Sequence, residues 1–189
     1  MTGATAEGEL IRRARGGDQD AFAELVAANS DRVFGALRRF GLDRAEADEV
    51  SQEVFLRAWR GLPGFEQRSR FSTWLYRIAF NEAQRLLSRR RPSPVAVDPE
   101  GPDPIASLPD APEQRPEALA LDNELMRALE MALMQLPADW RMAVVLRDIE
   151  GLSTEEAAAV VGIGPAAFKS RLHRGRMRLR ELIEPYLTL

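Results

Sequence analysis

The chain has 189 residues, 45% of them hydrophobic, a length and a composition that suit one large globular domain or two small ones. It contains no cysteine, which excludes disulfides, zinc–thiolate sites and thiol catalysis, and it shows neither a signal peptide nor an apolar run near the about 18 residues of a membrane span. The net charge of −3 argues against nucleic-acid binding, but basic residues cluster at Arg85–Arg91 and Lys169–Arg180, and such clusters bind phosphate whatever the total charge.

The first part of the chain is expected to form helices. Apolar residues in the segment 18–40 recur with a period near 3.6, which is typical of an amphipathic helix. Asp43 and Glu46 have the spacing of an N-terminal cap pair, and apolar residues from Val50 to Leu62 continue one face of a second helix. No segment alternates with the two-residue period of a strand.

Proline marks the next two breaks in the chain. Pro63 and Gly64 end the second helix, and Ser72 opens a third that runs over about 73–90. Residues 92–117 then hold eight of the twelve prolines, and six acids against one arginine. Because proline removes amide donors and disfavours helix in the residue before it, this segment is predicted to be an extended, acidic, flexible linker.

The segment after the linker is also expected to be helical. Apolar residues from Leu121 to Leu136 mark one helix, which Pro137 ends, and a second helix follows as far as Gly151. The predicted fold class is therefore all-α. Two small helical domains, residues 1–91 and 118–189, are joined by the flexible linker 92–117.

A helix-turn-helix is indicated near the C-terminus. Ser153 and Glu156 form a capping-box pattern before a short Ala-rich helix, and a glycine-containing turn follows at 162–164. Pro165 suits the first turn of the next helix, where a missing amide costs nothing. That second helix is strongly cationic, which is the layout of a motif whose second helix enters the DNA major groove.

The cationic helix supplies the candidate residues for duplex DNA. Residues near the start of a recognition helix reach base edges, and later arginines reach phosphates. The alternative is a solvated basic face on an ordinary amphipathic helix, but the cap, the turn and the preceding helix favour DNA contact. The candidates are Lys169, Ser170, Arg171, His173, Arg174, Arg176 and Arg178.

Residues Ala47 to Arg91 resemble region two of the extracytoplasmic-function sigma factors, the compact group of bacterial promoter-specificity subunits. The matching residues are Asp48, Gln52, Glu53, Val54, Phe55 and Trp59, and then Phe71, Thr73, Trp74, Leu75, Ile78, Ala79 and Asn81. The cationic C-terminal stretch is similar to region four of the same family, including its K-S-R-L-H-R-x-R core at Lys169 to Arg176. Two motifs in the family's order cover nearly the whole chain except the linker and the first few residues.

The resemblance implies that the first domain captures the non-template strand of the −10 promoter element. Such strands are held by aromatic stacking and cationic grooves, and an amide at Asn81 could read a flipped base. Trp74, Ile78, Asn81 and Arg85 fall on one helix face, although Trp74 and Ile78 could be core residues and Asn81 an ordinary solvated amide. The candidates are Arg68, Arg70, Trp74, Ile78, Asn81, Arg85, Arg89, Arg90 and Arg91.

The resemblance also implies core RNA polymerase as a partner, through the coiled coil of its largest subunit and its flap. The candidate residues for the coiled coil form a mixed polar surface on the helix after Asp43, which without the resemblance is a plain solvated face. They are Asp48, Glu49, Gln52, Glu53, Leu56 and Arg57. The family's two promoter elements lie about 70 Å apart, and a 26-residue Pro-rich linker spans about 80 Å, so the linker is long enough.

The chain is thus identified as a member of this family, a cytoplasmic sigma factor that directs promoter-specific initiation and binds promoter DNA. The resemblance further implies control by an anti-sigma factor. We expect no enzymatic activity, cofactor, metal, small-molecule substrate or membrane insertion, since His173 is the only histidine and no phosphate loop or ligand cluster is visible. The alternatives are a dimeric stand-alone helix-turn-helix regulator and, more distantly, a protein-binding adaptor.

Three departures from the family pattern place local contacts in question. Ala166, Ala167 and Phe168 stand where the family commonly has Gly-Thr-Val, so a hydroxyl that could bond a phosphate is missing at Ala167. Phe80 stands where many members carry a basic residue, and Gln84 replaces a frequent aspartate.

Overall fold

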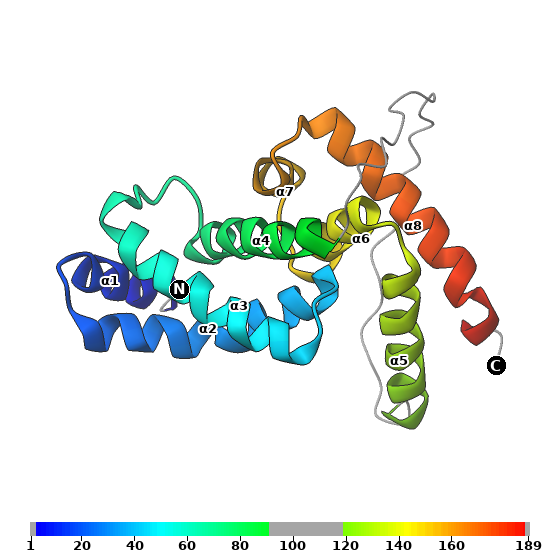
Figure 1. Ribbon diagram of the computed structural model, residues 1–189, viewed down its shortest axis with the longest axis horizontal. Helices are drawn as coiled ribbons and strands as arrows, with labels where there is room; N and C mark the ends of the chain where they lie inside the picture. The colour runs from blue at the N-terminus through cyan, green and yellow to red at the C-terminus, as the bar shows by residue number, and fades with distance from the viewer. Residues whose placement is uncertain (1–2, 91–118, 188–189) are drawn as a thin grey trace.

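The computed structural model describes residues 3–90 and 119–187, and within these ranges the chain forms helices and no strand (Figure 1). The predicted all-α class is confirmed. The first part contains α1 (Gly3–Arg15), α2 (Gln19–Phe40), α3 (Arg44–Gly61), the 3-10 turn η1 (Leu62–Gly64) and α4 (Phe71–Arg90). The second part contains α5 (Leu119–Gln135), α6 (Ala138–Val144), the π-helical turn η3 (Val145–Ile149), α7 (Thr154–Val161) and α8 (Pro165–Leu187).

Side-chain caps begin α2 and α3, and of these two only the cap of α3 was predicted. The Asp18 side chain accepts a hydrogen bond from the backbone N–H of Ala21 at 3.0 Å, and Asp43 and Glu46 form a complete capping box at the start of α3. Helix α4 begins at Phe71, one residue before the expected start, and α1 was not predicted. The proline-rich linker lies outside the described residues, and the division into three segments at 91 and 117 stays a prediction.

The two helical parts share one continuous hydrophobic core. Helix α4 contacts α7, and α2 contacts α5, α6 and η3, so buried residues from Ile11 to Leu172 form a single cluster. In Figure 1, α7 lies above α4, α6 lies near the right end of α4, and α5 and α8 extend on the right, away from the first part. The two parts are therefore packed against each other and are not held apart.

Arg141 of α6 lies at the centre of this contact and is only 8% exposed. Its Nη2 donates to the Phe40 carbonyl at 3.0 Å, and its Nη1 donates to the Met134 carbonyl at 3.2 Å. Both carbonyls lie in the last turns of helices, α2 and α5, where acceptors lack intrahelical partners. One guanidinium therefore joins the ends of two helices from different parts of the chain.

A second polar cluster lies between α4 and η3. The Tyr76 hydroxyl donates to the carboxylate of Glu150, whose side chain is 5% exposed, and Arg39 Nη1 lies 3.5 Å from the same carboxylate. Burial, together with Glu150, raises the pKa of Tyr76 above its ordinary value, so the tyrosine stays a donor. The π turn ends at this point, where the backbone N–H of Glu150 donates to the Val145 carbonyl at 2.9 Å.

A third contact joins α4 to the helix-turn-helix. The Thr73 hydroxyl donates to Glu156 Oε1 at 3.3 Å, and Glu156 also accepts from the Ser153 backbone N–H at 2.8 Å. The backbone hydrogen bond from Ser153 is the largest cause that holds the pKa of Glu156 below its ordinary value. The carboxylate that caps α7 thus also fixes α7 to α4.

Replacing Gly41 by alanine is expected to destabilise the contact around Arg141. Gly41 has φ +107°, a left-handed conformation that costs other residues about 1–2 kcal/mol, and an added Cβ would lie 2.6 Å from Arg141 Nη2. Urea denaturation should show that the free energy of unfolding decreases by at least that amount. Gly64→Ala is the matched control, because an added Cβ there meets no heavy atom within 4 Å. Equal losses in the two variants would contradict this account.

Acidification should weaken the fold partly through Glu156. A carboxyl whose folded pKa is lowered stabilises the fold above its unfolded pKa, near 4.5, and loses that effect as the pH falls through the folded pKa. Glutamine also serves at this position of a capping box, so Glu156→Gln should keep the cap but lose this contribution to the pH dependence. Urea midpoints measured from about pH 5 to about pH 3 should decline less steeply for the variant. Parallel declines would show that Glu156 does not titrate in the expected way.

Candidate nucleic-acid interface

The helix-turn-helix forms as predicted. Ser153 and Glu156 make the capping box of α7, Gly162 takes a left-handed conformation with φ +73° after it, and Pro165 opens α8. Phe168 is fully buried, and a Cβ at Gly175 would lie 2.8 Å from Val144 Cγ2. The absence of a side chain at Gly175 therefore lets α8 lie close against α6, which fixes the outer face of α8.

The predicted DNA residues of α8 occupy the helix faces beside this buried stripe. Lys169, His173, Arg176 and Arg178 are exposed, whereas Ser170, Arg171 and Arg174 are partly buried. Arg180, the last residue of the basic cluster but not one of the candidates for DNA contact, is also exposed and lies eleven residues after Lys169, hence on the same side of the helix.

Three of these arginines have acidic partners within the chain. Arg176 makes two hydrogen bonds to Asp148 of η3, from Nε at 2.9 Å and from Nη2 at 2.6 Å, and the pair raises the pKa of Arg176. Arg171 lies 3.3 Å from Asp139, and Arg178 lies 2.7 Å from Glu181. Arg176 is thus turned toward the protein, and its contact with DNA requires sharing or breaking that pair.

A second candidate surface is an open groove between the C-terminal end of α3 and one face of α4, the α3–α4 groove. Its lining comprises Arg57, Arg60, Gly61, Trp74, Ile78, Asn81, Glu82, Gln84, Arg85 and Ser88. Four predicted −10 residues, Trp74, Ile78, Asn81 and Arg85, are therefore brought together, as their spacing on one helix face indicates. Arg60 begins the segment 60–70, which the family resemblance also implies for the −10 element, whereas Arg57, Glu82, Gln84 and Ser88 were not predicted for this surface.

Trp74 contributes both to packing and to the groove. Its ring stacks on Phe65 with centroids 4.9 Å apart and 29° between the planes, and a Cβ at Gly61 would lie 3.2 Å from Trp74 Cζ2. The indole is partly buried and its position is fixed by these neighbours. Asn81 is exposed.

The other predicted −10 residues lie elsewhere. Arg68 and Arg70 are exposed on the loop before α4, where Arg68 lies 2.6 Å from Glu66. Arg89 lines a second groove, which adjoins the α3–α4 groove and shares Arg57, Glu82 and Arg85 with it. Arg90 ends α4, its side chain is not among those described, and Arg91 lies outside the described residues.

The predicted polymerase face lies on α3 as expected. Asp48, Glu49 and Gln52 are exposed. Leu56 is also 50% exposed, a high value for a large hydrophobic side chain. Leu56 and Gln52 also border an apolar groove that the sequence analysis missed, lined by Gln19, Phe22, Val26, Gln52, Phe55, Leu56 and Trp59. Arg57 differs from its neighbours, since it reaches from α3 into the α3–α4 groove.

The departures from the family pattern have structural roles. Phe80 packs edge-on against Phe40 with centroids 6.3 Å apart, and the Gln84 amide lies 3.4 Å from Met142 Sδ of α6. Ala166 and Ala167 are exposed at the start of α8. Phe80 therefore supports the core beneath α4, and Gln84 joins the two parts of the chain.

The described residues contain no group of three or more histidines, cysteines, aspartates or glutamates placed to hold a metal ion. Within the same ranges, no helix has the length and apolar character needed to cross a membrane.

The comparison with known proteins finds two family regions in this chain. The family model of sigma-70 region 2 matches residues 25–92, and that of sigma-70 region 4 matches residues 126–179. The chain is 36% identical to the RNA polymerase sigma-H factor of Pseudomonas aeruginosa, over 95% of this chain and 94% of that protein. It is 35% identical to the ECF RNA polymerase sigma-E factor of Escherichia coli K12, over 94% of each chain.

Two solved structures resemble both parts together. CnrH, solved in complex with the cytosolic domain of CnrY, has a TM-score of 0.68 and 30% identity and covers 95% of this chain and 98% of its own. The sigma factor RpoE, solved with the anti-sigma factor NepR from Bartonella quintana, has a TM-score of 0.64 and 25% identity, with 86% of this chain and 96% of its own covered. The alternatives of a stand-alone regulator and an adaptor are therefore wrong, and the chain belongs to the extracytoplasmic-function sigma factors, which direct RNA polymerase to initiate transcription at specific promoters.

Proposed function

We propose that this sigma factor holds the non-template strand of the −10 element in the α3–α4 groove. The composition of the groove carries the proposal: the exposed amide of Asn81, the fixed indole of Trp74 and three guanidinium groups converge on one open surface. Single-stranded DNA is bound by this combination of an aromatic ring and cations. Arg68 and Arg70, on the loop beside the groove, and Arg89 to Arg91 contact phosphates that flank it.

Helix α8 reads the −35 element in duplex form. Its N-terminal residues, the exposed Lys169 and His173 and the partly buried Ser170 and Arg171, reach base edges, and Arg174, Arg176 and Arg178 reach phosphates. The exposed side chains of Ala166 and Ala167 offer only methyl groups at the helix start, so hydrogen bonding to DNA begins at Lys169.

The polymerase docks on α3. The exposed Leu56 lies among the acids Asp48, Glu49 and Glu53, so the face combines an apolar contact with negative charge, and Gln52 adds an amide. The chain regulates transcription as a bound subunit and performs no chemistry of its own. It works in the cytoplasm, where bacterial RNA polymerase synthesises RNA.

The packed arrangement is a resting state that opens on the promoter. Helix α7 contacts both α4 and α8, and packed helices lie 8–10 Å apart, so at α7 the two DNA-reading helices are within about 20 Å of each other. The two promoter elements lie about 70 Å apart. The two parts must therefore separate before both elements are bound.

An anti-sigma partner stabilises the packed state. CnrH and RpoE were each solved with a bound protein, and for RpoE that protein is an anti-sigma factor. This chain resembles CnrH over 95% of its length, which includes both DNA-reading parts. A partner that binds the packed form and not the open form lowers the fraction of sigma factor molecules that are in the open form and can direct polymerase to a promoter.

Run-off transcription from a promoter library, with core polymerase free of other sigma factors, tests these assignments. Asn81→Ala should relax base preference only at the −10 element, and Arg171→Ala only at the −35 element, each by about five- to hundredfold for the base that it contacts. Arg127→Ala, an exposed arginine on α5, is the matched control and should leave both preferences unchanged. Unaltered preferences in the first two variants would refute the site assignment.

A further inference from the structure

Glu82 is the one acidic side chain among the described residues that line the α3–α4 groove. It follows Asn81 directly, and its side chain is 13% exposed. A carboxylate repels the phosphates of DNA and by itself lowers the affinity of a groove for DNA. An acid in such a groove can therefore favour DNA binding only through its effect on neighbouring residues.

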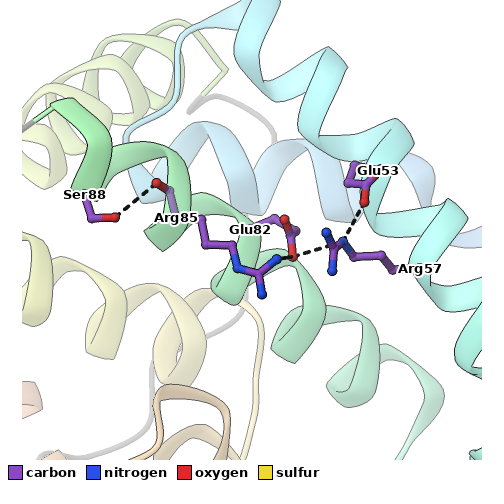
Figure 2. A network of polar contacts seen from close by, with 5 residues as sticks. All are labelled: Glu53, Arg57, Glu82, Arg85 and Ser88. Carbon is purple, nitrogen blue, oxygen red and sulfur yellow. Dashed lines mark hydrogen bonds and ion pairs between the residues drawn. The ribbon is translucent and has the colours of Figure 1, made fainter.

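Glu82 lies between two of the three arginines of the groove (Figure 2). Its Oε1 is 3.1 Å from Arg57 Nε and 3.2 Å from Arg85 Nη1, so one oxygen holds guanidinium groups from two different helices. Glu53, on the outer side of α3, lies 2.6 Å from the same Nε of Arg57. Figure 2 shows the resulting row of alternating charges, which runs from Glu53 through Arg57 and Glu82 to Arg85.

The shared oxygen has two effects on the arginines. It brings two cations closer together than their mutual repulsion otherwise favours, and the hydrogen bond that it accepts from Nη1 of Arg85 fixes the direction of that guanidinium. It also compensates part of their positive charge. The groove therefore attracts the phosphate backbone of DNA less strongly, whatever the base sequence. The remaining selectivity then comes from the amide of Asn81 and the ring of Trp74, which interact with bases.

We propose that Glu82 is a positioning residue that sets the specificity of the groove. It holds Arg57 and Arg85 in place for a phosphate and limits their attraction for DNA strands of the wrong sequence. The proposal rests on the proposed function of the groove in binding the −10 strand.

The test uses holoenzyme reconstituted from the full chain and core polymerase. Binding is measured by fluorescence anisotropy on a labelled non-template −10 oligonucleotide, taken from the promoter selected by run-off transcription, and on a scrambled oligonucleotide, over a range of salt concentrations. Glu82→Gln should bind the scrambled strand about five- to tenfold more tightly. Its affinity for the −10 strand should increase by a smaller factor, so the ratio of the two affinities should decrease. The slope of log affinity against log salt should steepen by about 0.7 for each additional phosphate that the variant neutralises.

Two further variants separate positioning from loss of structure. Glu24→Gln removes an exposed acid from α2, outside the groove, and should change neither the preference nor the slope. Glu82→Gln combined with Arg85→Gln restores the charge balance and should return the salt slope toward the original value, which repair of a folding defect would not do.

The outcomes are distinct. Equal weakening of both strands with an unchanged slope, or no change at all, would overturn the role of Glu82. A holoenzyme of the unaltered chain with no preference for the −10 strand would instead overturn the proposed function of the groove.

Discussion

The guanidinium of Arg141 joins the two parts of this molecule. Carbonyl groups at the C-terminal end of a helix lack intrahelical donors and carry partial negative charge, and Arg141 donates to such groups on both α2 and α5. A hydrogen bond that involves a charged group typically contributes about 1.5–3 kcal/mol, so the bond from Arg141 to the Phe40 carbonyl favours the packed arrangement. Gly41 makes the approach possible because its α-carbon carries no side chain.

The same packing defines the resting state that we propose for the free protein. Asn81 of the groove and Lys169 of α8 remain exposed in the packed state, so the DNA-reading surfaces are not hidden. What the packed state fixes is the distance between them, through α7, which contacts both α4 and α8. In the resting state proposed above, each surface is already formed, and only the contacts between the two parts have to be broken.

The sequence was most informative where a local rule decides the structure. The cap pairs at Asp43 and Ser153 and the single helix face of Trp74 and Asn81 were predicted correctly, because each depends on residues a few positions apart. The family resemblance supplied the roles of these surfaces, and the comparison with known proteins confirmed the family. The roles of single residues remain proposals.

Contacts between distant segments could not be predicted in this way. The hydrogen bonds of Arg141 to Phe40 and of Thr73 to Glu156 join residues far apart in the chain, and no periodicity encodes them. Arg57 was assigned to the polymerase face because helix spacing places it near Glu53, but its side chain also reaches α4. The spacing of residues along a helix gives the direction in which a side chain leaves the helix axis. Which partner that side chain contacts depends on the neighbouring helix.

The distance between α4 and α7 tests the central claim most directly. The chain has no cysteine, so Arg77→Cys and Glu155→Cys, two exposed positions on these helices, can carry spin labels for pulsed dipolar measurements. The account predicts a short distance, below about 20 Å, in the free chain and a distance approaching about 70 Å in a transcribing complex on its promoter. A short distance that persists in a complex that makes RNA would contradict it.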